Sequence, residues 1–385
     1  GNKVKKMENN STKLIKILNR IPDIRQQGKV LHSLVDIVFI AIVATVAGAD
    51  DWECMQIFAE DHIEWFRKYI PLTNGIPSHD TIERVFKQIN PKIFMKCFME
   101  WTQMVANIIK KGTVAIDGKT MCSTYDSATG KKALHIVSAW FSETGMVLGQ
   151  VKTTEKSNEI TAIPELLDIL DIAGYIVTID AMGTQKDIAE KIIKNKGDYV
   201  LALKGNHPLL HKEIEEFFKE AEDKKYQKEY GINTYQSYDK GHGRIESRSY
   251  YITSNIRWLD ARKEWKNLTS IGKVVYHSEQ NGKKTCETRY YLCSIEADAP
   301  KFANTVRKHW GIESMHWSLD VTFNEDSKRV RKDHAPENLS VLHKFAYNIL
   351  KLEKSKKRRS LKAKRFKASG SLSYLEKVLS CISTD

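Results

Sequence analysis

The sequence predicts an α/β protein in which a mixed β-sheet core follows an all-helical N-terminal region. Apolar residues recur at helical spacing over residues 12–110. From residue 113, three strand-like segments follow one another, and helices then alternate with strands as far as residue 222. This succession is typical of a ribonuclease-H-like core. Residues 235–297 interrupt the alternation with β-branched and aromatic residues, which predicts a β-rich insertion.

The composition is that of a folded protein with a strongly basic segment near its C-terminus. The 385 residues carry a net charge of +13, and 41% of them are hydrophobic, as expected for a soluble protein of two or three domains. Ten lysines and arginines but one acid, Glu353, lie between Lys351 and Lys367, so this segment holds +9 of the charge. Such a segment indicates a polyanionic partner, most simply nucleic acid. A solvated, partly disordered tail is an equally good interpretation.

Cysteine usage and the start of the chain predict a cytoplasmic protein. No cysteine forms a CxxC pair or a zinc-type spacing, which favours reduced thiols. The six are Cys54, Cys97, Cys122, Cys286, Cys293 and Cys381. The polar start does not resemble a signal peptide; Gly1 resembles a cleavage scar and Met7 a native start. Residues 34–49 are apolar but short for a bilayer and contain Asp36, so we expect a buried helix and no membrane association.

The N-terminal region is expected to consist of several helices. They cover residues 34–49, 52–70, 80–89 and 91–109. A turn precedes the third of them, and Ser78 or Asp80 could cap that helix. The last two could form a helix-turn-helix-like pair that contacts DNA, although a structural or dimerising role fits the pattern at least as well.

Two of the predicted strands end in a carboxylate. Small and β-branched residues from residue 113 lead to Asp117, and an apolar run from residue 175 leads to Asp180. The remaining pattern predicts strands over 135–141, 146–152 and 199–204, a helix starting at residues 157–159, and helices over 184–195 and 208–222. An Asp at a strand end is often a turn or capping residue, so each acid alone is weak evidence for a site.

A third acid lies on a helix predicted around residues 307–320. His309, Glu313, His316 and Asp320 fall on one stripe of this helix, separate from its apolar stripe. A solvated helix face is the alternative interpretation. Two carboxylates at the ends of adjacent strands repel each other unless a cation lies between them, and Mg²⁺ prefers carboxylates, water and phosphate oxygens. With a third acid, the pattern predicts a two-metal site for phosphoryl transfer.

Several short motifs together resemble one known family. The sequence resembles the DDE transposases of bacterial insertion sequences, specifically the group that contains the H-repeat-associated proteins of Rhs elements. The resemblance covers about residues 12–352. The motifs are GIPSHDT at 75–81, IDGKT at 116–120, TEKSNEITAIP at 154–164, DAM at 180–182, LKGN at 203–206, GHGR at 241–244, HWGIE at 309–313, HWSLDV at 316–321 and NED at 324–326.

The resemblance implies a ribonuclease-H-like catalytic domain with the triad Asp117, Asp180 and Glu313, which would bind two Mg²⁺ or Mn²⁺ ions. It also implies double-stranded DNA as the partner, as terminal inverted repeats and target DNA, a homodimer in the DNA complex, and action at the bacterial nucleoid. The expected function is cleavage at element ends and strand transfer into target DNA. A catalytically inactive DNA-binding descendant and a structure-specific nuclease are the alternatives.

The sequence departs from a related branch of the family at three positions. That branch has Tyr, Arg and Lys around the third acid, where this chain has Val306, His309 and Asp320, so we assign no roles from that signature. Candidate DNA contacts are Lys119, Lys204, Asn206, His242, Arg244, His309, His316 and Asp320. The glycine-rich stretch that holds His242 could contact phosphates near the site, or it could be a hairpin turn with solvated charges.

The expected domains follow these patterns. They are a helical N-terminal domain for DNA-end binding or dimerisation (1–110), the first part of the core (111–234), the β-rich insertion (235–298), the core completion with the Glu313 helix (299–352), and a basic tail with a short last helix (353–385).

Overall fold

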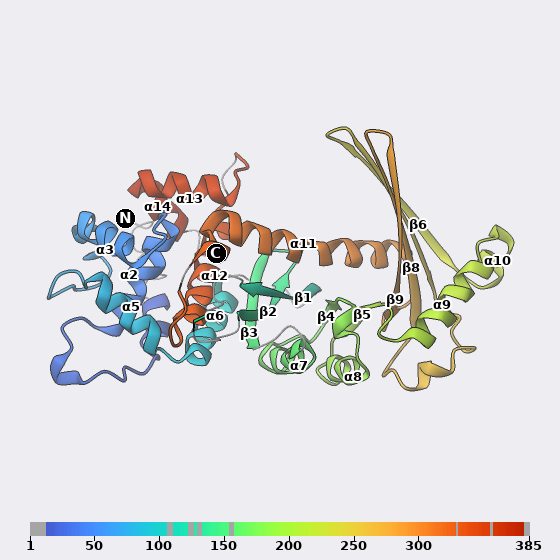
Figure 1. Cartoon of the computed structure of the whole chain (residues 1–385), viewed down its shortest axis with the longest axis horizontal. Helices are drawn as coiled ribbons and strands as arrows, with labels where there is room; N and C mark the ends of the chain where they lie inside the picture. The colour runs from blue at the N-terminus through green and yellow to red at the C-terminus, as the bar shows by residue number, and fades with distance from the viewer. Residues whose placement is uncertain are drawn as a thin grey trace.

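The computed structural model describes residues 13–105, 111–121, 127–128, 133–153, 158–328, 330–354 and 357–380. Helices from both halves of the chain form one end of an elongated molecule, a β-sheet fills the middle, and long β-hairpins form the other end (Figure 1). The predicted mixed α/β class is confirmed. None of the helices within these ranges is long and apolar enough to span a bilayer. Predictions that concern residues 7, 106–110, 122, 154–157 and 381–382 lie outside the described residues.

The first helices surround a strongly apolar one. They are α2 (Leu34–Val46), α3 (Trp52–Asp61), α4 (Ile63–Phe66), α5 (His79–Gln88) and α6 (Pro91–Val105). In α2 nearly every side chain is buried, because α3 and α5 contact it, and so do α12 (Ala335–Leu352) and α13 (Leu361–Gly370) from the end of the chain. The Ser78 hydroxyl accepts a hydrogen bond from the Thr81 N–H at 3.3 Å, which confirms the predicted cap of α5. The segment expected to be helical over 52–70 is two helices, because the backbone leaves the helical conformation at His62.

The sheet has nine strands in the order β3-β2-β1-β4-β5-β9-β8-β7-β6. Strands β1 (Gly112–Met121), β2 (Leu134–Phe141) and β3 (Met146–Thr153) are antiparallel, whereas β4 (Tyr175–Ile179) runs parallel to β1 and β5 (Asp198–Leu203) runs parallel to β4. Helix α7 (Glu159–Ile169) precedes β4, and α8 (Lys186–Lys194) connects β4 to β5. This succession of three antiparallel strands and then alternating helices and strands agrees with the prediction.

The β-rich region continues the same sheet. It comprises β6 (Asn233–Gly241), β7 (Arg244–Thr253), β8 (Ser270–Gln280) and β9 (Lys283–Cys293), and it follows α9 (Pro208–Glu220) and α10 (Lys224–Glu229). Strand β9 pairs antiparallel with β5, which joins the hairpins to the rest of the sheet. The β-rich stretches of the sequence at 249–252, 271–276 and 288–292 fall in β7, β8 and β9. Strand β6 was missed because almost all its side chains are exposed and carry no apolar alternation.

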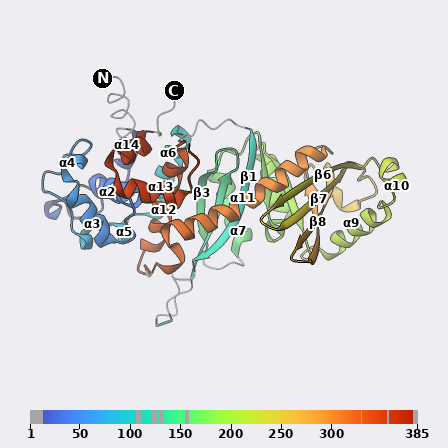
Figure 2. The same ribbon diagram turned by 90° about the horizontal axis from the view of Figure 1, so that it is seen from above.

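Helix α11 (Ala299–Phe323) lies across the sheet and links the hairpin end to the helical end (Figures 1 and 2). It contacts β1 and β4 in the middle and β6 and β7 near its start. Gly311 allows this close packing, because a Cβ at that position would lie 2.2 Å from the Trp140 ring of β2. The helix ends at Asn324, whose left-handed φ of 54° turns the chain towards α12 (Ala335–Leu352).

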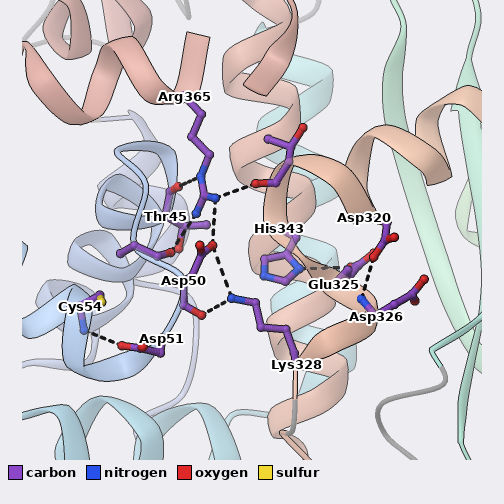
Figure 3. A network of polar contacts seen from close by, with 12 residues as sticks. Thr45, Asp50, Asp51, Cys54, Asp320, Glu325, Asp326, Lys328, His343 and Arg365 are labelled. Carbon is purple, nitrogen blue, oxygen red and sulfur yellow. Dashed lines mark hydrogen bonds and ion pairs between the residues drawn. The ribbon is translucent and has the colours of Figure 1, made fainter. Parts of the chain in front are cut away.

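The basic segment is folded against the helical end of the molecule. It forms α13 (Leu361–Gly370), followed by α14 (Leu372–Ser380). Lys364 and Arg365 are buried, so the interpretation as a solvated, partly disordered tail is wrong for the described part. The reason is that Arg365 donates to the carbonyl oxygens of Thr45, Ala49 and Thr322, at 2.9, 3.0 and 2.7 Å (Figure 3). It thereby satisfies backbone acceptors at the ends of α2 and α11.

Candidate active site

The parallel pairing of β1 and β4 brings two of the predicted acids to the same edge of the sheet. Ile116 of β1 is the register partner of Ile179 of β4, so Asp117 and Asp180 follow at the same level on neighbouring strands. The Asp180 carboxylate also accepts a hydrogen bond of 3.4 Å from the N–H of Gly183, which caps the short turn after β4. The register agrees with the prediction that the two acids lie close together, but the prediction that Asp117 ends its strand was wrong, because β1 continues to Met121 by pairing with β2.

Helix α11 carries the third acid to the same region. Glu313 is exposed and lines a pocket of about 170 Å³ together with Asp180. Lys204, Arg289 and His309 line the same pocket. Two carboxylates thus line a small space together with two cationic side chains, Lys204 and Arg289.

The Asp117 carboxyl is buried beside other carboxylates. Burial raises the pKa of the Asp117 carboxyl to about 7, and the neighbouring carboxylate of Asp180 adds to this rise. Glu159 and Glu313 raise the pKa further, whereas a hydrogen bond from the backbone of Gly118 opposes the rise. Four carboxylates therefore share one electrostatic environment. A cation in this environment would favour the ionised form of Asp117.

The donor set fits a hard divalent cation, although the side chains are not gathered tightly around one point. Within the described ranges, no three Asp, Glu, His or Cys side chains are close enough to hold a metal ion as they stand. The Asp117 and Asp180 carboxylates and the His316 imidazole next to Asp117 are nevertheless the kind of ligands that such ions take. The Nε2 atom of His316 is buried without a hydrogen-bond partner, and it lies 3.7 Å from an Asp117 carboxylate oxygen.

The two histidines of the polar stripe are neutral near pH 7. Burial and the Arg289 guanidinium lower the pKa of His309 to about 4. Its Nδ1 shares a hydrogen bond of 2.7 Å with the Thr178 hydroxyl of β4, which connects α11 to the strand that precedes Asp180. Burial and nearby lysines lower the pKa of His316 to about 3. Both side chains lie beside the acids, but neither carries a positive charge there.

The other predicted contact residues have different surroundings. Asn206 donates to the carbonyl of Ala181 at 2.8 Å and so holds the turn after Asp180. Lys119 forms an ion pair with Asp326 at 3.4 Å, and its side chain is only 19% exposed. Its charge is therefore largely compensated within the chain.

Three further candidates lie away from the pocket wall. Asp320 accepts a hydrogen bond of 2.9 Å from the N–H of Asp326 at the end of α11. His242 and Arg244 belong to the turn of the β6–β7 hairpin, at its free end (Figure 1). The structure thus supports the hairpin interpretation of this stretch and places both residues outside the pocket that Asp180 and Glu313 line.

Two groups near the acids were missed by the sequence analysis. The guanidinium groups of Arg248 and Arg289 lie over the Trp310 ring, at 4.8 and 6.0 Å from its centroid. Nothing in the sequence marks these arginines, because strand pairing alone brings β7 and β9 to α11.

The second missed group is a buried pair directly behind Asp117. Glu159 lies 2.5 Å from Nε2 of His135, and a Cβ on Gly118 would lie 2.1 Å from the Glu159 carboxylate. Gly118 is therefore required for this close approach. Glu159 stands in one of the recognised motifs, which is the signal that could have identified it.

Comparison with known proteins is consistent with this arrangement. The chain belongs to a family of transposases, the one described as "Transposase DDE domain", whose model matches residues 109–349. A second model, described as "DDE_Tnp_1-associated", matches residues 15–102. The family resemblance drawn from the sequence is confirmed. Members of this family generally use divalent metal ions.

The relatives cover almost the whole chain. It is 44% identical over 376 residues to "Putative transposase YncI" of Escherichia coli O157:H7, which covers 96% of this chain and 95% of that protein. It is 41% identical over 375 residues to "H repeat-associated putative transposase YhhI" of Escherichia coli K12, with 95% and 97% covered. A solved piggyBac transposase synaptic complex with hairpin DNA shares 12% identity, with a TM-score of 0.39 over 96% of this chain and 79% of that one.

Proposed function

We propose that this chain is a DDE transposase with a ribonuclease-H-like core, which cleaves DNA at the ends of an insertion sequence and transfers the freed strand into target DNA. The observation that supports the proposal is the β1–β4 register, which puts Asp117 and Asp180 at the same level on neighbouring strands, together with the pocket that Asp180 and Glu313 line. Membership of the transposase family supports the same assignment. The partner is double-stranded DNA, bound by a homodimer at element ends in the bacterial nucleoid, without membrane contact.

Asp117, Asp180 and Glu313 would hold the metal ions, Mg²⁺ or Mn²⁺, two per site. When bound, such ions activate a water or 3′-hydroxyl for attack and stabilise the leaving oxygen. Lys204 and Arg289 line the pocket and contribute fixed positive charges for the phosphate that is cut.

The rest of the site positions these groups. His309 and Thr178 connect α11 to β4, so that the Glu313 helix and the Asp180 strand keep their relative position. Asn206 holds the turn after Asp180. Positioning of this kind supplies a large part of the rate enhancement in phosphoryl transfer.

The test is cleavage of a labelled duplex that bears the element's own terminus, with wild type, Glu313→Gln and a matched control, Glu190→Gln. Glu190 is an exposed residue of α8 outside the pocket. We expect Mg²⁺-dependent cutting at the terminus by wild type and control, and none by Glu313→Gln or in EDTA.

Three other outcomes contradict the proposal in different ways. Equal cutting by Glu313→Gln would mean that the active site is elsewhere. Binding without cutting in Mg²⁺ and Mn²⁺ would indicate an inactive DNA-binding descendant. Equal cutting of duplexes with and without a terminus would indicate a structure-specific nuclease.

A further inference from the structure

The basic segment, residues 354 and 357–370, has buried cations on one side and exposed cations on the other. Lys364 and Arg365 are buried against the protein. Lys354, Arg358 and Lys362 are exposed. In the described ranges, none of these three forms an ion pair with a carboxylate. The segment itself contains no acidic residue that could compensate them.

The inward cations hold the segment in a fixed position. Arg365 donates to three backbone carbonyls and also forms an ion pair of 2.9 Å with Asp50 (Figure 3). Lys364 donates to the Leu350 carbonyl at 3.0 Å, near the end of α12. A flexible tail would lose conformational entropy on binding a partner, whereas cations on a docked helix are already in place.

The local field around the exposed cations is positive. Burial lowers the pKa of the Lys351 ammonium, and Lys364 and Arg358 lower it further. A neighbouring polyanion would compensate this charge. The exposed side of α13 also presents the Phe366 ring, 80% exposed.

The segment lies on the catalytic helix at a defined distance from the candidate site. Both ribbon views place α13 beside the C-terminal end of α11, where Arg365 binds the Thr322 carbonyl (Figures 1 and 2). Thr322 follows Glu313 by nine residues, which is about 13 Å of helix, or about four base pairs of duplex. The ten residues of α13 span about 15 Å, so Lys362, which lies one turn before Arg365, is within about four base pairs of Thr322.

The α11 surface between the two places is open to a ligand. Trp317 is 68% exposed and Val321 is 38% exposed, one and two turns after Glu313 on the same helix face. Asp320, which is half-exposed, is the one acidic side chain that follows Glu313 on α11. A duplex whose phosphate lies at Glu313 could therefore continue towards α13 past a single further carboxylate of this helix.

We propose that Lys354, Arg358 and Lys362 form a second DNA-contact surface, which holds the phosphate backbone about four to eight base pairs from the cleaved phosphate. The proposal rests on the proposed function, because it takes Glu313 as the point of cutting. Contacts of this kind fix the position of the duplex and are independent of base sequence.

The first experiment measures binding without cleavage. Lys354, Arg358 and Lys362 are changed together to Gln in the full chain with Glu313→Gln, and the dissociation constant for a fluorescent duplex is measured by anisotropy from 50 to 300 mM KCl without divalent metal. Each lost phosphate contact lowers the slope of log K against log salt by about 0.9, so we expect a decrease of about 2.7. Affinity at about 100 mM salt should fall more than tenfold.

The matched control changes three exposed lysines at the opposite end of the molecule. Lys224, Lys225 and Lys228 of α10 become Gln, with the same change in net charge. This variant should keep the wild-type slope. The proposal would be overturned if the two triple variants had the same salt slope and the same affinity. This holds whether both keep the wild-type values or both lose affinity to the same extent. Because all six side chains are exposed, unchanged thermal midpoints should verify folding.

The second experiment tests the position of the contact. Neutral methylphosphonate linkages are placed either four to eight or twelve to sixteen base pairs from the cleaved phosphate, on each side in turn. Wild type should lose affinity with the nearer set on one side only, and the triple variant should be insensitive to that set. A loss that does not depend on position would overturn the assignment to this surface. If the chain did not cleave DNA, the salt dependence of its DNA binding would be unchanged. A failure of the proposed function can therefore be distinguished from a failure of the proposed contact surface.

Discussion

Replacement of Asp117 by Asn should stabilise the metal-free protein at pH 8. The pKa of this carboxyl rises from its ordinary value of 3.8 to about 7 in the folded chain. A raised carboxyl pKa means that the folded state favours the protonated form. The free energy of unfolding is therefore lowered progressively as pH rises from about 4 to 7. At 1.36 kcal/mol per pKa unit the full effect is about 4 kcal/mol, an upper estimate for a partly solvated group.

Asn removes this penalty because it is uncharged at every pH. In EDTA at pH 8 the thermal midpoint of Asp117→Asn should exceed that of wild type by several degrees, and the difference should nearly vanish at pH 4.5. Differential scanning calorimetry at both pH values measures it. Asp187→Asn, an exposed residue of α8, serves as the control and should show no such pH dependence. A lower thermal midpoint for Asp117→Asn than for wild type at pH 8 would refute the electrostatic argument. Equal stabilisation of the variant and of wild type by Mg²⁺ would also contradict it.

Three further predictions concern other parts of the molecule. Arg365→Met should lower the free energy of unfolding by about 3–5 kcal/mol, because buried carbonyls lose a charged donor, whereas exposed Arg358→Met should have little effect in urea denaturation. Gly311→Ala should cost about 1–3 kcal/mol, since its Cβ would overlap the Trp140 ring; an unchanged thermal midpoint would exclude this packing. Arg289→Gln should weaken duplex binding about tenfold and lower the salt slope by about one, measured by anisotropy.

The acids could be found from the sequence because their surroundings leave a local signal. The strand residues that precede Asp117 and Asp180 are mostly buried, so each acid follows a short apolar run. The α11 stripe that carries Glu313 follows from helical periodicity alone. For these residues, local pattern and tertiary position coincide, although their roles remain predictions.

The contacts made by strand pairing and by backbone acceptors could not be predicted in this way. Arg289 reaches the pocket because β9 pairs with β5, and that pairing joins residues about ninety positions apart. Arg365 donates to backbone carbonyl oxygens. Because every residue carries a backbone carbonyl, the residue types in the sequence do not indicate which ones Arg365 contacts. Strand β6 has an exposed polar composition that resembles a loop.

The interleaving of the two halves of the chain at the helical end has a consequence for synthesis on the ribosome. Helix α2 is buried against α12 and α13, yet α12 begins about 230 residues after α6 ends. During translation, the apolar side chains of α2 stay partly exposed until α12 and α13 have been synthesised. Transiently exposed apolar surface of this kind is what chaperones bind. A copy of the gene interrupted after α11 would encode all three acids but would remove the contacts of α2 with α12 and α13. Such a product would expose apolar side chains of α2 and should be prone to aggregation, even though every acid is intact.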